Sequence, residues 1–230
     1  MRILAVNAGS TSIKVSLVAD DGATTRFDSL EDAARRLDAM PAGVAHRLVH
    51  GGDRTDPVIV DDAVRDELDH VIELDPLHEL PELETVDRAR RQWPATPHIA
   101  VFDTAFHTTV PPAARHYALP EPWRGLLPAF GFHGLSHSWS TERLQALAPQ
   151  ARRVVIAHLG GGSSLCGVAD GESRVTTMGF TPLDGLVMAT RSGAVDPGLV
   201  LWLQEHAGVP PSELATGSEL LGPPDQYVGG

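Results

Sequence analysis

Two turns rich in glycine and serine, each directly after a short apolar strand, most constrain how this chain can fold. The first is Asn7-Ala8-Gly9-Ser10-Thr11-Ser12, and the second is Gly160-Gly161-Gly162-Ser163-Ser164. Each is followed by a predicted hairpin, which the dipeptides Asp21-Gly22 and Asp170-Gly171 mark. Strand and helix patterns alternate between the two hairpins. The sequence therefore predicts two α/β modules of similar design, at residues 1–150 and 151–230.

The composition of the two turns suits phosphate binding. Glycines let a backbone approach phosphate oxygens closely, and exposed N–H groups and serine hydroxyls can then donate to them. Neither turn has the spacing of a P-loop, and no Gly-Lys-Ser/Thr follows either one. A single turn of this kind is better explained as a plain hairpin turn. Two of them, each opening a separate module, favour phosphate binding.

The overall composition excludes several classes of function. The 230 residues carry a net charge of -12, which argues against non-specific nucleic-acid binding. Cys166 is the one cysteine, so no intrachain disulfide can form and a reducing, cytoplasmic location is expected. The first residues lack the long apolar core of a signal peptide. No apolar stretch of about 18 residues is present, so no membrane span is expected.

Two arginines and one carboxylate are candidate ligand-binding groups. Arg47 and Arg191 lie beside glycines in apolar stretches, and a guanidinium offers a planar fork to a carboxylate or a phosphate. Asp103 closes the predicted strand Ile99–Phe102, at the strand end where α/β folds place ligands. Such a carboxylate can hold Mg²⁺ or orient a nucleophile. The alternatives are two surface arginines and a helix N-cap.

The histidines raise the possibility of zinc. The pairs His46/His50 and His133/His137 have the i,i+4 spacing that suits zinc on a helix. The first pair lies in a predicted strand, where such side chains are about 13 Å apart. No cysteine cluster or His-Glu-x-x-His motif accompanies either pair. His133 is better interpreted as a donor beside an anion, or as a buried histidine with hydrogen-bonded ring nitrogens.

Six segments together resemble the acetate kinase (acetokinase) family, in the family's order and over essentially residues 1–200. They are Val6–Lys14, His46–Gly52, Phe102–His107, Gly131–Gly134, Met178–Leu186 and Thr190–Gly193. The resemblance implies a ribonuclease-H-like (actin-like ATPase) fold, shared with sugar kinases, heat-shock chaperones and actin, followed by an incomplete second domain of the same type. It also implies reversible transfer of the ATP γ-phosphoryl group to acetate, which gives acetyl phosphate and ADP and requires Mg²⁺ or Mn²⁺.

The resemblance also implies a role for each matching residue. Arg47 and Arg191 would flank the carboxylate and the passing phosphoryl group, Asp103 would orient the metal or substrate, and His133 would hydrogen-bond the phosphoryl oxygens. Residues near the phosphates and metal would be Asn7 for the metal, and Ser10, Ser12, Lys14, Gly160, Gly161 and Gly162 for the phosphates. A pocket for the methyl group would be formed by Val49, Leu77, Phe132 and Pro182, with His78 beside it.

The chain departs from the family pattern in four places. The stretch from Lys14 to Arg47 is short, Glu79-Leu80 replaces Asn-Pro, and Gly161 replaces an asparagine. The adenosine-binding segment and a catalytic glutamate, which lie further along in the family, have no match. We therefore expect an N-terminal part with little activity alone and doubtful homodimerisation. The alternatives are a butyrate- or propionate-type kinase, favoured by Gly161 and Glu79, and a non-catalytic anion-binding remnant.

Overall fold

The computed structural model describes residues 1–8, 13–52, 54–71, 76–120, 127–208 and 210, and for 76–79 it describes the backbone only. The chain forms two compact units, Met1–Ala105 and Phe106–Gly230. This division differs from the predicted domains 1–150 and 151–230, because helix α5 (Gly134–Leu147) packs against the later strand β7 (Arg153–Leu159). The assignment of those two domains to the family fold stays a prediction.

The first unit is built on a six-stranded mixed sheet. Its strands are β1 (Arg2–Ala8), β2 (Ile13–Ala19), β3 (Thr24–Phe27), β4 (Gly43–Leu48), β5 (Val58–Ile59) and β6 (His98–Phe102), in the order β3-β2-β1-β4-β6-β5. The first three form an antiparallel meander that includes the predicted hairpin at Asp21-Gly22. Strands β1, β4 and β6 run parallel, so their carboxyl ends meet at one edge of the sheet. That edge carries the candidate residues of this unit.

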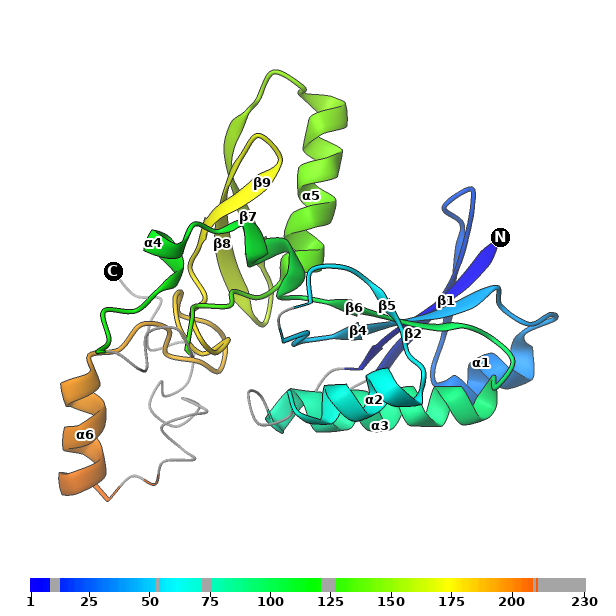
Figure 1. The fold of residues 1–230 in the computed structure, drawn as a ribbon, viewed down its shortest axis with the longest axis horizontal. Helices are drawn as coiled ribbons and strands as arrows, with labels where there is room; N and C mark the ends of the chain where they lie inside the picture. The colour runs from blue at the N-terminus through cyan, green and yellow to red at the C-terminus, as the bar shows by residue number, and fades with distance from the viewer. Residues whose placement is uncertain (9–12, 53, 72–75, 121–126, 209, 211–230) are drawn as a thin grey trace. The chain divides into compact units, whose positions relative to one another are not determined.

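Three helices accompany this sheet (Figure 1): α1 (Leu30–Arg36), α2 (Asp62–Asp69) and α3 (Pro76–Gln92). Ser29, with Asp32 three residues later, resembles a capping box and predicts a helix start. The Ser29 hydroxyl does cap α1, accepting a 3.1 Å hydrogen bond from the Asp32 N–H. The helical periodicity of Pro81–Trp93, with a proline first, predicts a helix that begins at Pro81. This prediction was wrong, because α3 begins at Pro76 and contains Pro81. Proline at the first position of a helix costs no hydrogen bond, and Pro76 therefore marks the start.

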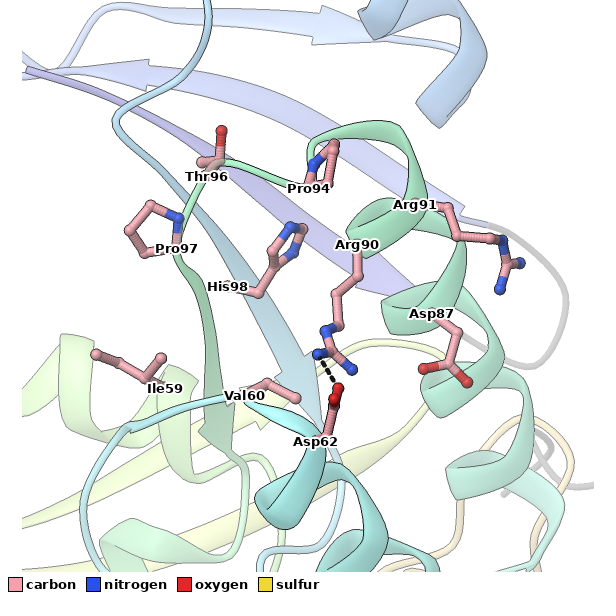
Figure 2. Close-up of a pocket in the computed structure, with 10 residues that line it drawn as sticks. All are labelled: Ile59, Val60, Asp62, Asp87, Arg90, Arg91, Pro94, Thr96, Pro97 and His98. Carbon is pink, nitrogen blue, oxygen red and sulfur yellow. Dashed lines mark hydrogen bonds and ion pairs between the residues drawn. The ribbon is translucent and has the colours of Figure 1, made fainter.

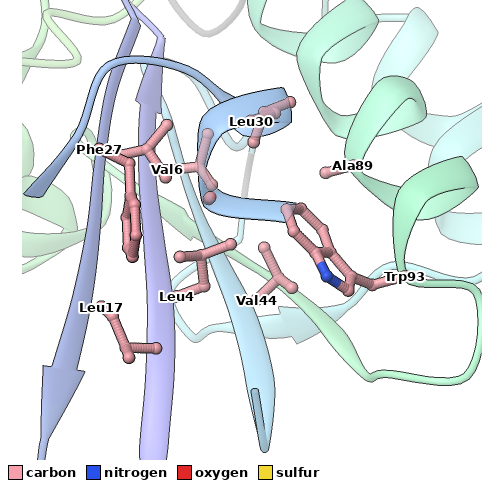
Figure 3. Packing of buried hydrophobic residues seen from close by; sticks show 10 residues of the cluster. Leu4, Val6, Leu17, Phe27, Leu30, Val44, Ala89 and Trp93 are labelled. Atoms are coloured by element: carbon pink, nitrogen blue, oxygen red, sulfur yellow. The ribbon is translucent and has the colours of Figure 1, made fainter. Parts of the chain in front are cut away.

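The core of the first unit lies between the sheet and helices α1 and α3 (Figure 3). Alternate residues of the strands point into it, as the period-two pattern predicts. Its buried members are Leu4, Val6, Val15, Leu17, Phe27, Leu30, Ala33, Val44, Ala89 and Trp93. A second cluster joins α2 and α3 to β4 and β6, through Leu48, Val60, Leu68, Leu83, Val86, Ala100 and Phe102. Together they fix α3 against the sheet.

The second unit contains a three-stranded antiparallel sheet. Its strands β7, β8 (Ser163–Ala169) and β9 (Glu172–Thr176) lie in the order β7-β8-β9, and α5 lies beside β7 (Figure 1). The predicted hairpin joins β8 to β9, where Asp170 and Gly171 have φ angles of 54° and 86°. The second glycine-rich turn joins β7 to β8, and the Gly160 N–H donates to the Gly162 carbonyl over 3.0 Å.

The remaining elements are short. They are the 3-10 helix η2 (Ala105–Thr109), α4 (Pro112–Arg115) and α6 (Pro197–His206). The Asp196 carboxylate caps helix α6 by accepting from the Gly198 N–H at 2.7 Å. Leu199 and Trp202 of α6 are about half exposed. Within the described residues, no helix combines the length and apolar character needed to cross a membrane.

Candidate active site

Arg47, Asp103 and Glu82 form an ion-pair cluster at the carboxyl ends of β4 and β6. The Arg47 Nε and Nη2 atoms donate to Asp103 Oδ2 over 3.1 and 2.6 Å, and Nη1 donates to Glu82 Oε1 over 2.5 Å. Arg47 and Asp103 come together because β4 and β6 are parallel and in register, with Leu48 opposite Phe102. The structure thus brings together two of the predicted catalytic residues.

Glu82 is a member of this cluster that the sequence analysis missed. Its side chain is 1% exposed, and its second oxygen accepts a 2.7 Å hydrogen bond from the Val49 N–H. Along α3 the residues 82, 86, 89 and 93 form one helical stripe, and the other three are the buried Val86, Ala89 and Trp93. An acidic residue on the apolar stripe of a helix is the signal that could have identified it.

The cluster carries more negative than positive charge. One guanidinium, 21% exposed at its side chain, faces two carboxylates that are 1% and 6% exposed. Burying a carboxylate is costly unless it is paired and hydrogen-bonded, and both are. The arrangement holds the Arg47 guanidinium in one orientation.

Asn7 lies on the strand next to that of Arg47, and Lys14 lies one strand further away. Asn7 on β1 stands directly opposite Lys14 on β2 and directly opposite Arg47 on β4. Side chains at directly opposite positions lie on the same face of a sheet. Asn7 and Lys14 are exposed. The predicted phosphate ligands Ser10 and Ser12 lie outside the described residues.

The residues of this edge fit a hard divalent cation better than zinc. The Asp103 carboxylate and the Asn7 amide are oxygen ligands of the kind that Mg²⁺ prefers. The described part of the chain holds no group of three or more His, Cys, Asp or Glu residues arranged for a metal ion. Mg²⁺ commonly uses only one or two carboxylates and takes its other ligands from phosphates and water. A magnesium ion shared with a nucleotide is therefore compatible with the residues present.

In the second unit, His133 and Arg191 both lie next to Gly162. A Cβ atom added to Gly162 would be 3.2 Å from His133 Nε2 and 3.6 Å from Arg191 Nη1. The glycine-rich turn therefore runs directly beside an imidazole and a guanidinium, two groups that can donate to an anion. Gly161 has open space around its Cβ position.

His133 is held by contacts on several sides. It precedes α5 in a left-handed conformation with φ 59°, its Nδ1 lies 2.9 Å from Ser164 Oγ, and its ring stacks on His158 with centroids 4.1 Å apart. Gly131, with φ 73°, permits this segment to pass close to His107, because a Cβ there would be 2.8 Å from the His107 ring. A glycine at position 131 is thus a requirement of tight packing.

Arg191 is held by the segment that precedes it. Its Nη1 donates to the Pro182 carbonyl over 3.0 Å and lies 3.7 Å from Met188 Sδ. Gly193, with φ 72°, lies so close to Gly185 and Leu186 that a Cβ would be 2.6 Å from their carbonyl groups. The glycine that follows Arg191 therefore allows the two segments to lie together.

The predicted phosphate turn and methyl pocket are placed only in part. The serines of the turn bond within the protein, since Ser163 Oγ lies 3.4 Å from the Gly160 carbonyl and Ser164 Oγ bonds to histidines. Of the predicted pocket residues, Val49 is buried in the first unit, and Phe132 and Pro182 are buried in the second. The side chains of Leu77 and His78 are not described.

A hollow of about 520 Å³ lies at the other end of β6 from Asp103. It is lined by Ile59, Val60, Asp62, Asp87, Arg90, Arg91, Pro94, Thr96, Pro97 and His98. Figure 2 shows Arg90 directed at Asp62, with a separation of 2.6 Å, while Arg91 points away. Five residues of strand separate His98 from Asp103, roughly 16 Å. The hollow is therefore distinct from the candidate site.

Two of the histidines considered for zinc, His46 and His137, are instead buried and hydrogen-bonded to other groups. His46 Nε2 lies 3.0 Å from His98 Nδ1, and burial lowers the pKa of His46 to about 3. His137 Nε2 lies 2.8 Å from Ser164 Oγ, and burial lowers the pKa of His137 to about 4. Both rings are therefore neutral at pH 7.

The family profile that matches this chain and two curated relatives share one description. The profile of the acetokinase family matches residues 20–219. An acetate kinase of Deinococcus radiodurans is 44% identical over 178 residues, which cover 74% of this chain and 44% of that protein. An acetate kinase of Rickettsia akari is 37% identical over 210 residues, which cover 89% of this chain and 54% of that protein.

Solved structures agree with the sequence comparisons. A propionate kinase of Francisella tularensis has a TM-score of 0.85 and 30% identity, over 96% of this chain and 69% of that one. An acetate kinase of Entamoeba histolytica has a TM-score of 0.80 and 28% identity, over 94% of this chain and 65% of that one. The fold is thus the actin-like ATPase fold. The chain belongs to the acetokinase family. It spans about half the length of the curated relatives that it matches.

Proposed function

We propose that this chain carries the carboxylate- and phosphoryl-binding residues of an ATP-dependent acetate kinase. The observation that most supports the proposal is the position of His133 Nε2 and Arg191 Nη1 beside Gly162 of the glycine-rich turn. A second support is Arg47, whose guanidinium is oriented by two buried carboxylates. Both observations fit phosphoryl transfer to a carboxylate, the reaction after which the acetokinase family is named.

The reaction requires alignment and charge compensation rather than a strong base. An oxygen of the acetate carboxylate forms a bond to the γ-phosphorus of ATP, and the bond from that phosphorus to the oxygen of ADP breaks. A carboxylate is already ionised at neutral pH, so no proton has to be removed from it. Arg47, Arg191 and His133 would donate to the carboxylate and to the phosphoryl oxygens, which carry the charge in the transition state. His133 is well suited to this role because its ring is fixed by hydrogen bonding and stacking.

We further propose that Asp103 and Asn7 hold Mg²⁺ or Mn²⁺ together with ATP or ADP. The metal would supply neutralisation of phosphate charge. Asp103 keeps its place through the Arg47 guanidinium, which donates to Oδ2. Lys14, directly opposite Asn7, would add positive charge beside the phosphates. The Gly160–Gly162 turn would lie close to the phosphates and donate backbone N–H groups to them.

The preferred acid is a second question. The structural similarity to a propionate kinase, together with Gly161 and Glu79, supports a propionate- or butyrate-type preference as the alternative. Comparison of kcat/KM for acetate, propionate and butyrate decides it. A sharp preference for acetate excludes the alternative, and a higher value for a longer acid supports it.

Binding and turnover of the 230-residue chain test the proposal. Titration calorimetry with acetyl phosphate should show binding, and Arg47→Ala and Arg191→Ala should each weaken it. Arg152→Ala is the control and should leave the affinity unchanged, because Arg152 is exposed and forms its ion pair with the exposed Asp170. Absence of acetyl phosphate binding would overturn the proposal. Trapping of acyl phosphate with hydroxylamine, in the presence of ATP, Mg²⁺ and acetate, then measures turnover. Turnover that depends on Arg47 excludes a non-catalytic anion-binding protein, and binding without turnover favours it.

A further inference from the structure

The Ser164 hydroxyl lies between two histidine rings. Ser164 Oγ is 2.9 Å from His133 Nδ1 and 2.8 Å from His137 Nε2, and Ser164 is fully buried. A hydroxyl has one proton to donate. If it donates to one ring nitrogen, the other ring nitrogen must donate to it. Ser164 therefore accepts a hydrogen bond from one histidine and donates one to the other. Which histidine is the donor fixes the tautomer of both rings.

His137 determines which direction applies. Its Nδ1 is buried and has no hydrogen-bond partner among the described residues. A neutral imidazole carries its proton on one nitrogen only. If that proton were on Nδ1, a buried N–H would be left without an acceptor, which is rarer in proteins than an under-satisfied acceptor. The proton therefore belongs on Nε2, where it is donated to Ser164 Oγ.

The groups around His137 agree with a neutral ring. His107 and His158 lie against it, with ring centroids 5.7 and 6.4 Å away. The His107 ring is itself committed, because its Nε2 lies 3.0 Å from the Phe132 carbonyl and must donate to it. Burial lowers the pKa of His137 to about 4, and His107 and His158 act in the same sense. His137 therefore remains a donor through Nε2 alone at neutral pH.

The hydrogen bond from His137 to Ser164 determines which ring nitrogen of His133 carries the proton. Since His137 donates to Ser164, the Ser164 hydroxyl donates to His133 Nδ1. An accepting Nδ1 carries no proton, so the ring proton of His133 is on Nε2. That nitrogen is the atom nearest to the Cβ position of Gly162, at 3.2 Å, and Arg191 Nη1 lies 3.6 Å from the same position. An N–H group is thus directed at the glycine-rich turn, where an acceptor oxygen of a phosphoryl group would be bound.

We propose that Ser164 and His137 are positioning residues that fix the tautomer of His133, so that its Nε2–H is a hydrogen-bond donor toward a phosphoryl group at the Gly162 turn. The identity of the ligand rests on the proposed function, but the tautomer does not. Ser164 lies in the glycine-rich turn that the sequence predicts to bind phosphate. It would contribute through His133 rather than by donating to phosphate itself.

Nitrogen NMR of the histidine rings tests the tautomer in the 230-residue chain. Two-bond proton–nitrogen spectra of a sample labelled with ¹⁵N-histidine at pH 8 distinguish a protonated from an unprotonated ring nitrogen, and His133→Gln assigns the His133 signals by their loss. We expect His133 to be protonated on Nε2 and His137 on Nε2. A wild-type His133 ring protonated on Nδ1 would overturn the proposal.

Variants test the two positioning residues. In Ser164→Ala and His137→Leu, His133 should lose its single tautomer, and the share protonated on Nδ1 should rise. His137→Gln keeps an N–H donor and should restore most of the wild-type spectrum. Ser173→Ala is the matched control, because Ser173 is equally buried and its hydroxyl bonds to His107 Nδ1 at the same distance of 2.9 Å. It should leave the His133 signals unchanged. Unchanged His133 signals in Ser164→Ala would contradict the proposal.

Acetyl phosphate affinity separates this inference from the proposed function. Ser164→Ala should weaken binding by about fivefold, the equivalent of one ordinary hydrogen bond, while Ser173→Ala should not. If the tautomer changes as expected but no form of the protein binds acetyl phosphate, the proposed function fails and the positioning of His133 stands. If acetyl phosphate binds with the same affinity to wild type and Ser164→Ala, the positioning role fails and the proposed function stands.

Discussion

Glu82 of helix α3 holds Arg47 at the end of strand β4, with Nη1 of the arginine 2.5 Å from Oε1 of the glutamate. The opposite side of the same guanidinium donates to Asp103 Oδ2. Glu82 also accepts a hydrogen bond from the Val49 N–H. One buried carboxylate thus connects α3 to both the side chain and the backbone of the segment that carries Arg47. The orientation of Arg47 depends on how α3 docks on the sheet.

Replacement of Glu82 should therefore destabilise the first unit. We expect Glu82→Ala to lower the free energy of unfolding by about 1.5–3 kcal/mol, the scale of hydrogen bonds to a charged group, because the Val49 N–H and one side of Arg47 lose their acceptor. Urea unfolding followed by circular dichroism measures the change. Glu84→Ala, at an exposed position of the same helix, should change the free energy of unfolding far less. Equal effects of the two substitutions would contradict a structural role for Glu82.

Arg47 and Arg191 should both be needed for turnover in any form of the protein that is active. Arg47→Ala or Arg191→Ala should lower kcat by roughly 10²–10³, the scale of losing one transition-state donor. Steady-state hydroxamate assays at saturating ATP and acetate measure kcat. The exposed Arg152→Ala serves as the control for loss of positive charge. Near-normal kcat in either of the first two variants would refute the assigned roles.

The glycine-rich turn should tolerate a methyl group at one position and not at the next. A Cβ on Gly162 would lie 3.2 Å from His133 Nε2, and the His133 ring cannot easily move because it bonds to Ser164 and stacks on His158. We expect Gly162→Ala to weaken acetyl phosphate binding about tenfold, or by about 1.4 kcal/mol. Gly161→Ala meets open space and should bind as wild type does. Calorimetry on both variants measures the difference, and equal affinities would show that the turn does not contact the ligand.

The buried histidine pair should make the first unit sensitive to acid. His98 Nε2 lies 3.1 Å from the Trp93 carbonyl and must donate to it, so His98 Nδ1 accepts from His46 Nε2–H. Burial lowers the pKa of His46 to about 3 and also lowers the pKa of His98. The pKa of each ring is therefore higher in the unfolded chain, near 6.5. The stability that the neutral pair provides is fully present above that value and is lost as the pH falls toward 3.

Urea unfolding at several pH values measures this dependence. Below pH 6.5 the free energy of unfolding should fall by about 1.4 kcal/mol per pH unit for each proton that unfolding takes up. His46→Leu should remove one such proton and give a shallower slope between pH 6 and pH 4. The variant should also be less stable at pH 7.5, because His98 Nδ1 loses its donor. A slope identical to that of wild type would show that His46 is not neutral in the folded state.

Local sequence patterns determined the elements of this protein and its family. Period-two alternation and the dipeptides Asp21-Gly22 and Asp170-Gly171 predicted both hairpins, and the Ser29 cap predicted the start of α1. These features depend on residues close together in the chain, whose conformations are set by local sterics and hydrogen bonds. The order of the signature segments indicated the family, which the comparisons confirmed.

The tertiary structure alone decided which groups hold the candidate residues. Glu82 reaches Arg47 across 35 positions of sequence, and Ser164 reaches His133 across 31. These contacts depend on how α3 docks on one sheet and how β8 pairs beside α5, which no local period encodes. The sequence pattern places Ser164 in a predicted phosphate-binding turn. Only the fold shows that its hydroxyl lies between two imidazole rings, where its one proton can be donated to only one of them.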